Sequence, residues 1–269
     1  MHPRYLIRRA LSSAMILLFA ANAFAQATQA PAKPFEPQVG QPGKDVVWVP
    51  TPQALVDKML DLAKVTPQDY VIDLGSGDGR TVITAARRGA RAHGIEYNPE
   101  MVTLAKRNAA QAGVNERATF AEADLFASDF SKAQVVTMFL LPSINMKLRP
   151  TILNMRPGTR VVSNSFTMED WQADVTETIQ DCQAWCTAHL WIVPAKVDGT
   201  WTLPQGALTL KQSFQNVSGS LGSTSLTDGK LRGEEITFKA GDAVYTGRVQ
   251  GNTMSGTTSA GAKWSATKR

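Results

Sequence analysis

Short apolar runs alternate with amphipathic segments through the middle of the chain, between residues 70 and 165. The apolar runs lie at 70–74, 91–96, 117–123, 134–140 and 158–165, and amphipathic segments lie between them at 79–88, 99–111 and 143–155. Apolar runs of this length are typical of strands buried on both faces, and the amphipathic segments have the period of helices that cover a sheet. The pattern therefore predicts an α/β fold, with a largely parallel sheet and helices on both of its faces.

Two further segments extend this domain. Residues 51–65 place apolar side chains on one face of a helix, with Thr51 positioned as the N-cap and Pro52 as the first helical residue. Beyond residue 165, strand-like runs at 174–179 and 189–195 flank a short segment that holds both cysteines. We expect these two runs to form a hairpin at one edge of the sheet.

The pattern of polar and apolar residues changes near residue 205 and divides the chain into two parts. From there on, polar and apolar residues alternate and turn residues recur at short intervals, which is typical of antiparallel strands joined by tight turns. We expect a small all-β antiparallel meander over 205–269, separate from a first domain at 46–204. Two of its segments, 229–233 and 247–256, share a similar spacing of glycines. Such strands suit either the close approach of a ligand or a stabilising or docking module.

The first 45 residues show neither pattern. Residues 1–25 combine three arginines with an apolar stretch and end in Ala-Phe-Ala, as signal peptides do, and the stretch is too short to span a bilayer. We predict cleavage after Ala25, a periplasmic location and no stable membrane anchor after cleavage. Residues 26–45 are rich in Pro, Gln and Ala and predict a flexible linker.

Composition and charge narrow the choice of function. The 269 residues are 43% hydrophobic, enough to bury a full core. The net charge is +5, but the three arginines of the predicted signal peptide account for part of it and leave +2. This excess is too small to indicate a nucleic-acid partner. The charge is also uneven, because residues 205–269 hold eight basic and four acidic side chains, which agrees with two structural units.

The two cysteines, Cys182 and Cys186, lie four residues apart. In an oxidising compartment such a pair forms a disulfide across a turn, whereas on a helix the same spacing leaves two free thiols. Both arrangements stay open. A metal site is disfavoured, because His189 is the only nearby histidine and zinc usually takes four ligands. We expect no bound metal.

A glycine loop follows the first predicted strand, with Gly75, Gly77 and Gly79 at alternate positions after Asp73. An acid at a strand end, followed by such a loop and a helix, places a ligand at the carboxyl edge of a parallel sheet. Dinucleotide sites use a Gly-x-Gly-x-x-Gly spacing, so the third glycine here falls one residue early. Asp78 also puts a carboxylate where a phosphate would be repelled. The loop therefore indicates a cationic ligand without phosphate.

Over residues 46–204 the chain resembles the class I S-adenosylmethionine-dependent methyltransferases. Three stretches carry the resemblance in matching order and spacing, DLGSGDG at 73–79, GIEYNP at 94–99 and AEADLF at 121–126. The resemblance implies a Rossmann-like class I methyltransferase sheet, with S-adenosyl-L-methionine as the cofactor.

The resemblance also assigns eight residues to the cofactor. By it, Asp73 lies near the ligand ammonium, Glu96 accepts from the ribose hydroxyls, and Asp124 accepts from the adenine amino group. The other five are Gly75, Ser76 and Gly77, where the backbone approaches the methionine portion, Leu125, whose backbone N–H meets a ring nitrogen, and Thr51, in the turn before the first helix.

The residues after the fourth strand of the predicted sheet bear on the methyl acceptor. Residues 138–171 are similar to protein-lysine methyltransferases of the telomeric-silencing type. Together with VPTP at 49–52, they are also similar to the mitochondrial enzymes that modify lysines of the adenine nucleotide translocase and the ATP synthase c subunit. This resemblance implies a protein substrate and an apolar slot for the lysine stem, formed by Phe139, Leu141, Pro142 and Phe166.

Two other functions stay open at this stage. One is a small-molecule methyltransferase, and the other is a non-catalytic exported binding protein built on a methyltransferase scaffold. The acids Asp73, Glu96 and Asp124 favour a working enzyme, because a site that has lost its activity has no physical need for three acids at strand ends.

Overall fold

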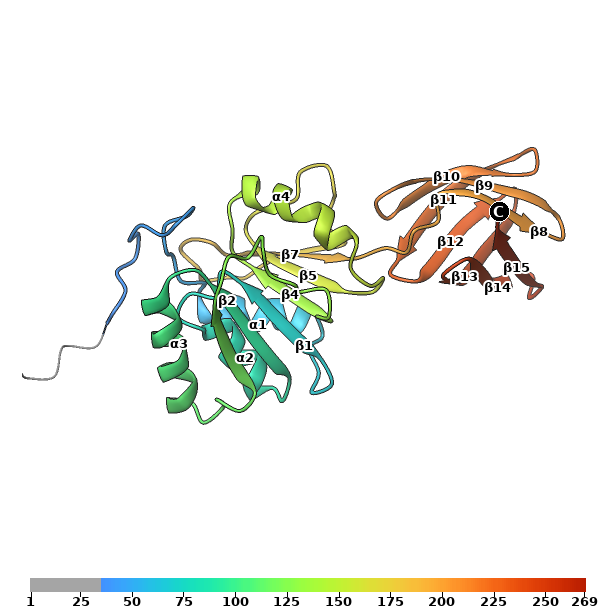
Figure 1. The fold of residues 1–269 in the computed structure, drawn as a ribbon. Coiled ribbons are helices and arrows are strands. Elements are labelled where there is room, and N and C mark those ends of the chain that lie inside the picture. The colour runs from blue at the N-terminus through green and yellow to red at the C-terminus, as the bar shows by residue number, and fades with distance from the viewer. Residues whose placement is uncertain (1–34) are drawn as a thin grey trace, which may run out of the picture. The chain divides into compact units, whose positions relative to one another are not determined.

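A seven-stranded sheet forms the first domain in a computed structural model that describes residues 35–269 (Figure 1). The strand order is β3-β2-β1-β4-β5-β7-β6. The parallel strands are β1 (Tyr70–Leu74), β2 (Arg91–Glu96), β3 (Ala118–Glu122), β4 (Val135–Met138) and β5 (Arg160–Asn164), and the antiparallel pair β6 (Val175–Thr178) and β7 (Thr187–Ile192) forms one edge. The predicted α/β fold and its edge hairpin are confirmed. The chain crosses from one side of β1 to the other between β3 and β4, which makes the end of β1 the switch point of the sheet.

Four helices cover the two faces of this sheet: α1 (Gln53–Leu62), α2 (Arg80–Arg87), α3 (Pro99–Gln111) and α4 (Pro142–Leu153). Successive residues of a strand point to opposite faces. Accordingly, Val71 of β1 belongs to the core cluster under α1, α2 and α3, whereas Ile72 and Leu74 belong to the cluster under α4. The predicted helices on both faces are therefore present.

The start of α1 differs from the sequence prediction. Thr51 is not the N-cap, because Pro52 occupies that position and its carbonyl accepts from the backbone N–H groups of Leu55 and Val56. Thr51 lies one residue earlier, where its side chain is buried and bonded to another part of the chain. By contrast, α3 begins as its sequence suggests, with Asn98 as a side-chain cap and Pro99 at the first helical position.

The predicted flexible linker is ordered over its described part. The predicted signal peptide and residues 26–34 lie outside the described residues. From residue 38 to residue 50, however, the chain folds back on itself in a segment we call the strap. Its backbone is held by hydrogen bonds from Gly40 N to Trp48 O and from Trp48 N to Gln41 O, each of 2.8–2.9 Å. The polar composition of its first part, residues 38–45, gives no sign of this structure, which depends on these hydrogen bonds and on contacts with the first domain.

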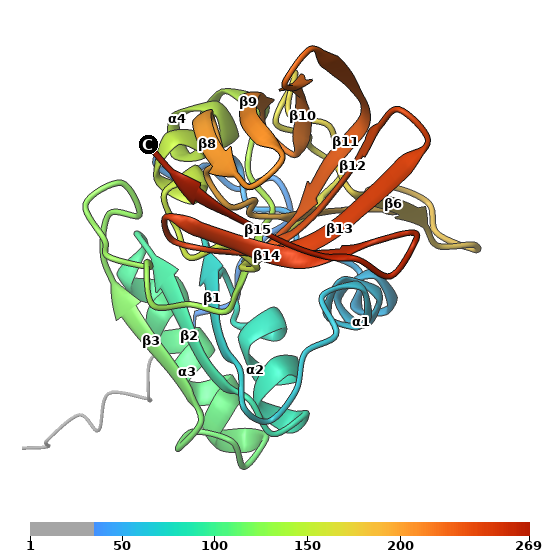
Figure 2. The same ribbon diagram turned by 90° about the vertical axis from the view of Figure 1, so that its right-hand side faces the viewer.

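Eight antiparallel strands form the C-terminal domain and close into a barrel (Figure 2). They are β8 (Gly199–Leu203), β9 (Gly206–Ser213), β10 (Asn216–Leu221), β11 (Thr224–Arg232), β12 (Glu235–Ala240), β13 (Ala243–Gln250), β14 (Thr253–Thr258) and β15 (Lys263–Lys268). The predicted meander is present, and β15 closes it by pairing with β8. The boundary expected between residues 204 and 205 therefore falls inside the barrel, because β8 belongs to the barrel and not to the preceding domain.

The repeated glycines of the barrel serve close backbone packing. A Cβ atom on Gly256 would come within 1.9 Å of the Thr246 carbonyl oxygen, and one on Gly229 within 2.1 Å of the Val217 carbonyl oxygen. Large side chains fill the interior, among them the buried Trp201, Phe238 and Trp264. The stabilising interpretation of these glycines thus has a direct steric cause. Among residues 35–269, no helix has both the length and the apolar character needed to cross a membrane.

Candidate functional site

A cavity of about 450 Å³ lies at the carboxyl ends of the central strands. Its wall is made by the glycine loop after β1, by the residues that follow β2, β3 and β4, and by the strap. Eleven of the twelve predicted site residues line it: Thr51, Asp73, Gly75, Ser76, Gly77, Glu96, Asp124, Leu125, Phe139, Leu141 and Phe166. The exception is Pro142, which begins α4 with its side chain exposed and does not line the cavity. The roles given to the eleven residues stay predictions.

The glycine loop brings backbone, rather than side chains, to the cavity wall. Gly75 and Gly77 have φ angles of 75° and 53°, in the left-handed region that glycine tolerates best. A Cβ on Gly77 would lie 2.8 Å from Nε1 of Trp48 in the strap. Ser76 is buried, and its hydroxyl has no hydrogen-bond partner within the described structure. Loop and strap are therefore packed so closely that only glycine fits between them.

Asp73 is a buried carboxyl group at the end of β1, with a side chain that is only 6% exposed. Burial raises its pKa to about 7. The hydrogen bond of 2.7 Å donated by the Thr137 hydroxyl opposes this rise, and the negative charges of Glu96 and Asp78 add to it. A carboxyl in this state is half protonated near neutral pH. A cation bound beside it would restore the ionised form, as the predicted contact with a ligand ammonium requires.

Glu96 uses both carboxylate oxygens to hold the loops around it. Oε2 accepts from the Gly77 backbone N–H and Oε1 accepts from the Asn98 backbone N–H, both at 2.9 Å. Each carboxylate oxygen has a second lone pair, which leaves capacity to accept from two neighbouring hydroxyl groups. The geometry at Glu96 therefore fits its predicted contact with a ribose.

Asp124 is engaged by the strap. Its Oδ2 accepts a hydrogen bond of 2.7 Å from Lys44 Nζ, and its Oδ1 accepts from the Phe126 backbone N–H at 2.9 Å. The bond from Lys44 lowers the pKa of Asp124. Lys44 also lies 4.3 Å from the ring centre of Tyr97, so the strap is fixed across this end of the cavity. A ligand amino group directed at Asp124 has to compete with Lys44.

Thr51 and Asp78 have contacts that the sequence does not predict. The Thr51 carbonyl accepts from the Arg80 guanidinium at 2.8 Å, and its hydroxyl accepts from the Asn164 side-chain amide at 3.2 Å. The carboxylate of Asp78, expected from the sequence to repel phosphate, is paired with Arg80 through hydrogen bonds to both oxygens. The argument against a phosphate ligand at the loop therefore rests on the glycine spacing.

The cavity wall as a whole is acidic. Among residues 35–269, five carboxyl side chains line it against two basic ones, and both basic side chains, Lys44 and Arg80, are paired with acids of the same wall. Cations are therefore attracted to this space and polyanions are repelled.

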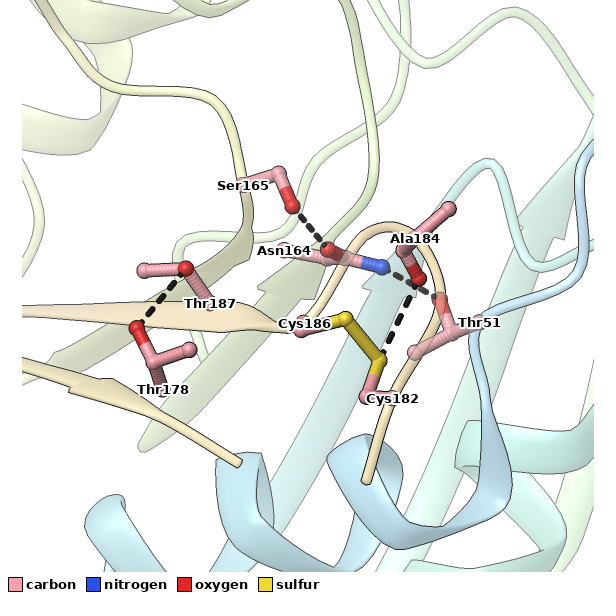
Figure 3. Close-up of a disulfide and its surroundings, with 8 residues drawn as sticks. All are labelled: Thr51, Asn164, Ser165, Thr178, Cys182, Ala184, Cys186 and Thr187. Carbon is pink, nitrogen blue, oxygen red and sulfur yellow. Dashed lines mark hydrogen bonds between the residues drawn. A yellow bond between two sulfur atoms is a disulfide. The ribbon is translucent and has the colours of Figure 1, made fainter. Parts of the chain in front are cut away.

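The mouth of the cavity carries a cluster of aromatic rings that sequence reasoning finds only in part. Phe139 and Phe166 are predicted from the sequence, but Trp185, which packs on both of them, is not. Trp185 lies in the loop between β6 and β7. A Cys182–Cys186 disulfide closes this part of the loop into a ring (Figure 3), so of the two arrangements left open for the cysteines the disulfide is the one present. The signal for it is the sequence CQAWC, in which a large aromatic residue lies between the two cysteines.

Comparison with known proteins shows that the chain is similar to methyltransferases. A family model described as the ANTKMT methyltransferase domain matches residues 73–175. The chain is 40% identical over 151 residues to a protein-lysine N-methyltransferase of Saccharolobus islandicus, and the match covers 55% of this chain and 94% of that protein. It is 31% identical over 172 residues to the lysine N-methyltransferase of Xenopus laevis that is named for the c subunit of ATP synthase, covering 64% and 69% of the two.

A solved structure is also similar. It is described as an RNA methyltransferase from Salinibacter ruber in complex with S-adenosyl-L-homocysteine, and the sequence identity is 48% with a TM-score of 0.53. The match covers 55% of this chain and 96% of that one.

Proposed function

Because the chain belongs to the S-adenosylmethionine-dependent methyltransferases, in the family of the protein-lysine N-methyltransferases, we propose that it methylates a lysine side chain of a protein. When bound, S-adenosyl-L-methionine supplies a methyl group on a positively charged sulfur. With the cofactor bound, the acceptor nitrogen would take this methyl group with its lone pair, and the sulfur would keep the electron pair of the S–C bond. The remaining work falls to the residues of this chain.

The residues around the cavity fit the cofactor. Asp73 holds the ammonium group, and Glu96, at the end of the neighbouring strand, accepts from the ribose hydroxyls through its free lone pairs. Asp124 and the Leu125 backbone hold the adenine once Lys44 has moved off the carboxylate. A donor set made of carboxylates, with no free basic group among the described residues of the wall, suits a ligand that carries two positive groups, one carboxylate and no phosphate.

The observation that carries the choice of acceptor is the acidic wall beneath an apolar mouth. A lysine arrives as a cation and has an apolar stem, so it matches both parts. Phe139, Leu141 and Phe166 supply apolar lining of the cavity. Burial against such side chains favours the neutral amine, whose lone pair is free to react.

RNA is the second candidate acceptor, because the similar Salinibacter ruber structure is described as an RNA methyltransferase. The electrostatics of the site disfavour it. RNA binding depends on basic side chains that neutralise phosphates, whereas the two basic groups that the described part of the chain places on this wall, Lys44 and Arg80, are already paired.

Labelled methyl transfer distinguishes the two acceptors. The purified chain is incubated with S-adenosyl-L-methionine that carries a labelled methyl group, once with a protein extract and once with total RNA. We expect label in N-methyl-lysine after protein hydrolysis, and loss of the label in the Glu96→Ala variant. Label in RNA alone would refute the lysine proposal. Cofactor binding without transfer to protein, RNA or small amines would show a non-catalytic binding protein instead.

We further propose that the chain is exported to the periplasm. Residues 1–25 have the composition of a signal peptide, and a disulfide between Cys182 and Cys186 is the state that an oxidising compartment favours. Fusion of residues 1–30 to a reporter that is active only after export tests this. An inactive reporter, with the fusion protein accumulating in the cytoplasm, would contradict the proposal.

A further inference from the structure

Three aromatic rings form one continuous wall at the mouth of the cavity. The ring centres of Phe139 and Phe166 are 5.9 Å apart, and Trp185 lies 5.5 Å from each of them. At these distances the rings touch one another and leave no slot between them, so a ligand side chain lies along the wall rather than inside a cage. The three residues come from the ends of β4 and β5 and from the β6–β7 loop, and all three line the cavity.

Trp185 has an unusual backbone conformation. Its φ angle is 59°, a conformation that costs free energy in a bulky residue. The Cys182–Cys186 disulfide closes the chain on either side of it (Figure 3). Two residues further on, the Thr187 carbonyl accepts from the Ser165 backbone N–H at 2.7 Å, which ties the loop to the end of β5. The crosslink and this hydrogen bond together hold the indole ring against the two phenylalanines.

Exposed apolar side chains gather around this cavity. Six large hydrophobic side chains are exposed among the described residues, and four of them line this cavity: Val47, Tyr97, Leu141 and Trp185. Exposed apolar groups that surround an opening mark a surface that another molecule covers. Since the wall below them is acidic, the covering molecule presents a cation within an apolar contact.

We propose that Trp185 is the residue that recognises the acceptor lysine, and that the Cys182–Cys186 disulfide makes this recognition dependent on oxidation. The inference rests on the proposed function, because it names a polypeptide lysine as the occupant. The lysine stem lies along the aromatic wall, and its ammonium group is attracted by the face of the indole before the proton is lost. Neighbouring apolar residues of the same polypeptide cover Val47 and Leu141. Reduction frees the loop, and Trp185 leaves the wall.

Binding without turnover tests the first part. The probe is a short unstructured peptide with one central lysine, compared with the same peptide carrying norleucine, both in the presence of saturating S-adenosyl-L-homocysteine. Trp185→Ala should weaken binding of the lysine peptide roughly two- to thirty-fold, the range of cation–π contacts. Trp185→Phe should retain most of the affinity. Equal binding of the lysine and norleucine peptides, or no effect of Trp185→Ala, would overturn the proposal.

The matched control is Phe126→Ala. Phe126 is exposed to 43%, close to the 40% of Trp185, but does not line the cavity. Its removal should leave peptide binding unchanged. A loss equal to that of Trp185→Ala would mean that any exposed ring contributes, and it would also overturn the assignment.

Reduction tests the second part. Treatment with a phosphine reductant should weaken peptide binding as much as Trp185→Ala does, with no change in the affinity for S-adenosyl-L-homocysteine. The Cys182→Ser, Cys186→Ser double variant should bind weakly with or without reductant. Unchanged peptide binding after complete reduction would refute the role of the disulfide. These results are independent of the proposed function, which fails instead if labelled methyl groups never reach lysine while the peptide still binds at Trp185.

Discussion

Replacement of Asp73 should change the stability of the fold and the affinity for the cofactor in opposite directions. In the unfolded chain its carboxyl has an ordinary pKa of 3.8, and in the folded chain burial raises the pKa to about 7. Between these two pH values the folded protein binds a proton that the unfolded protein does not. The free energy of unfolding therefore falls as the pH rises from about 4 to about 7. With about 1.4 kcal/mol for each unit of pKa difference, the full loss is about 4 kcal/mol.

The Asp73→Asn variant removes this titration and keeps the size of the side chain. Its amide oxygen can still accept from the Thr137 hydroxyl, which lies 2.7 Å from the carboxylate in the parent chain. At pH 5, about 1.2 units above the unfolded-state pKa of 3.8, the variant should already be more stable than the parent by about 1.6 kcal/mol. At pH 8.5 the variant should be the more stable, by up to about 4 kcal/mol. It should also lose affinity for S-adenosyl-L-methionine, because it no longer carries a charge to pair with the ammonium group.

The assay is scanning calorimetry of the parent and the variant at the two pH values. The transition of the first domain is identified as the one that S-adenosyl-L-homocysteine moves upward in the parent protein. Asp124→Asn serves as a control, because the pKa of Asp124 is lowered and not raised, so its replacement should give no stabilisation that grows with pH. A difference between parent and Asp73→Asn that stays the same at pH 5 and pH 8.5 would refute the reasoning about burial.

Three further outcomes follow from the cavity. The affinity of the parent chain for S-adenosyl-L-methionine should rise by about tenfold for each pH unit up to about pH 7 and then level off, because the ligand pairs with ionised Asp73. Titration calorimetry in two buffers of different ionisation heat should show that binding releases a proton. Gly77→Ala should lower cofactor affinity at least about tenfold, since the new methyl group meets Trp48 and the backbone has a positive φ; unchanged affinity would contradict the observed packing. Lys44→Ala should bind the cofactor a few-fold more tightly at low salt, with the difference vanishing at high salt, because Asp124 is freed from a surface ion pair.

The sheet is accessible to sequence reasoning because its signals are local. The apolar runs at 70–74 and 91–96 coincide with β1 and β2, and the periodic segment 99–111 coincides with α3. The acids at strand ends can be grouped in advance for a topological reason, since the carboxyl ends of parallel strands meet at one edge. Asp73 and Glu96 accordingly line the same cavity.

The features that the sequence does not predict depend on contacts between distant parts of the chain. The barrel closes through a short pairing of Thr267 with Thr202 and Lys268 with Trp201, which the hydrogen bond from the Arg269 backbone N–H to the Thr200 carbonyl extends, and neither strand carries a local signal of the other. The order of the strap likewise depends on Lys44, which pairs with a carboxylate 80 residues away. A polar, proline-rich composition predicts a linker unless such a partner is known.

The proposed export and the proposed role of Trp185 have a joint consequence for where the enzyme acts. In a reducing cytoplasm Cys182 and Cys186 stay as thiols, so on our proposal Trp185 is not held against Phe139 and Phe166 and the acceptor site is incomplete. The hydrogen bonds that position Asp73 and Glu96 do not involve this loop, so we expect the proposed cofactor contacts of these two residues in either state. Before export the chain would thus bind S-adenosyl-L-methionine without efficient capture of lysines. On these two proposals, oxidation after export completes the acceptor site and confines lysine methylation to proteins of the compartment where the disulfide forms.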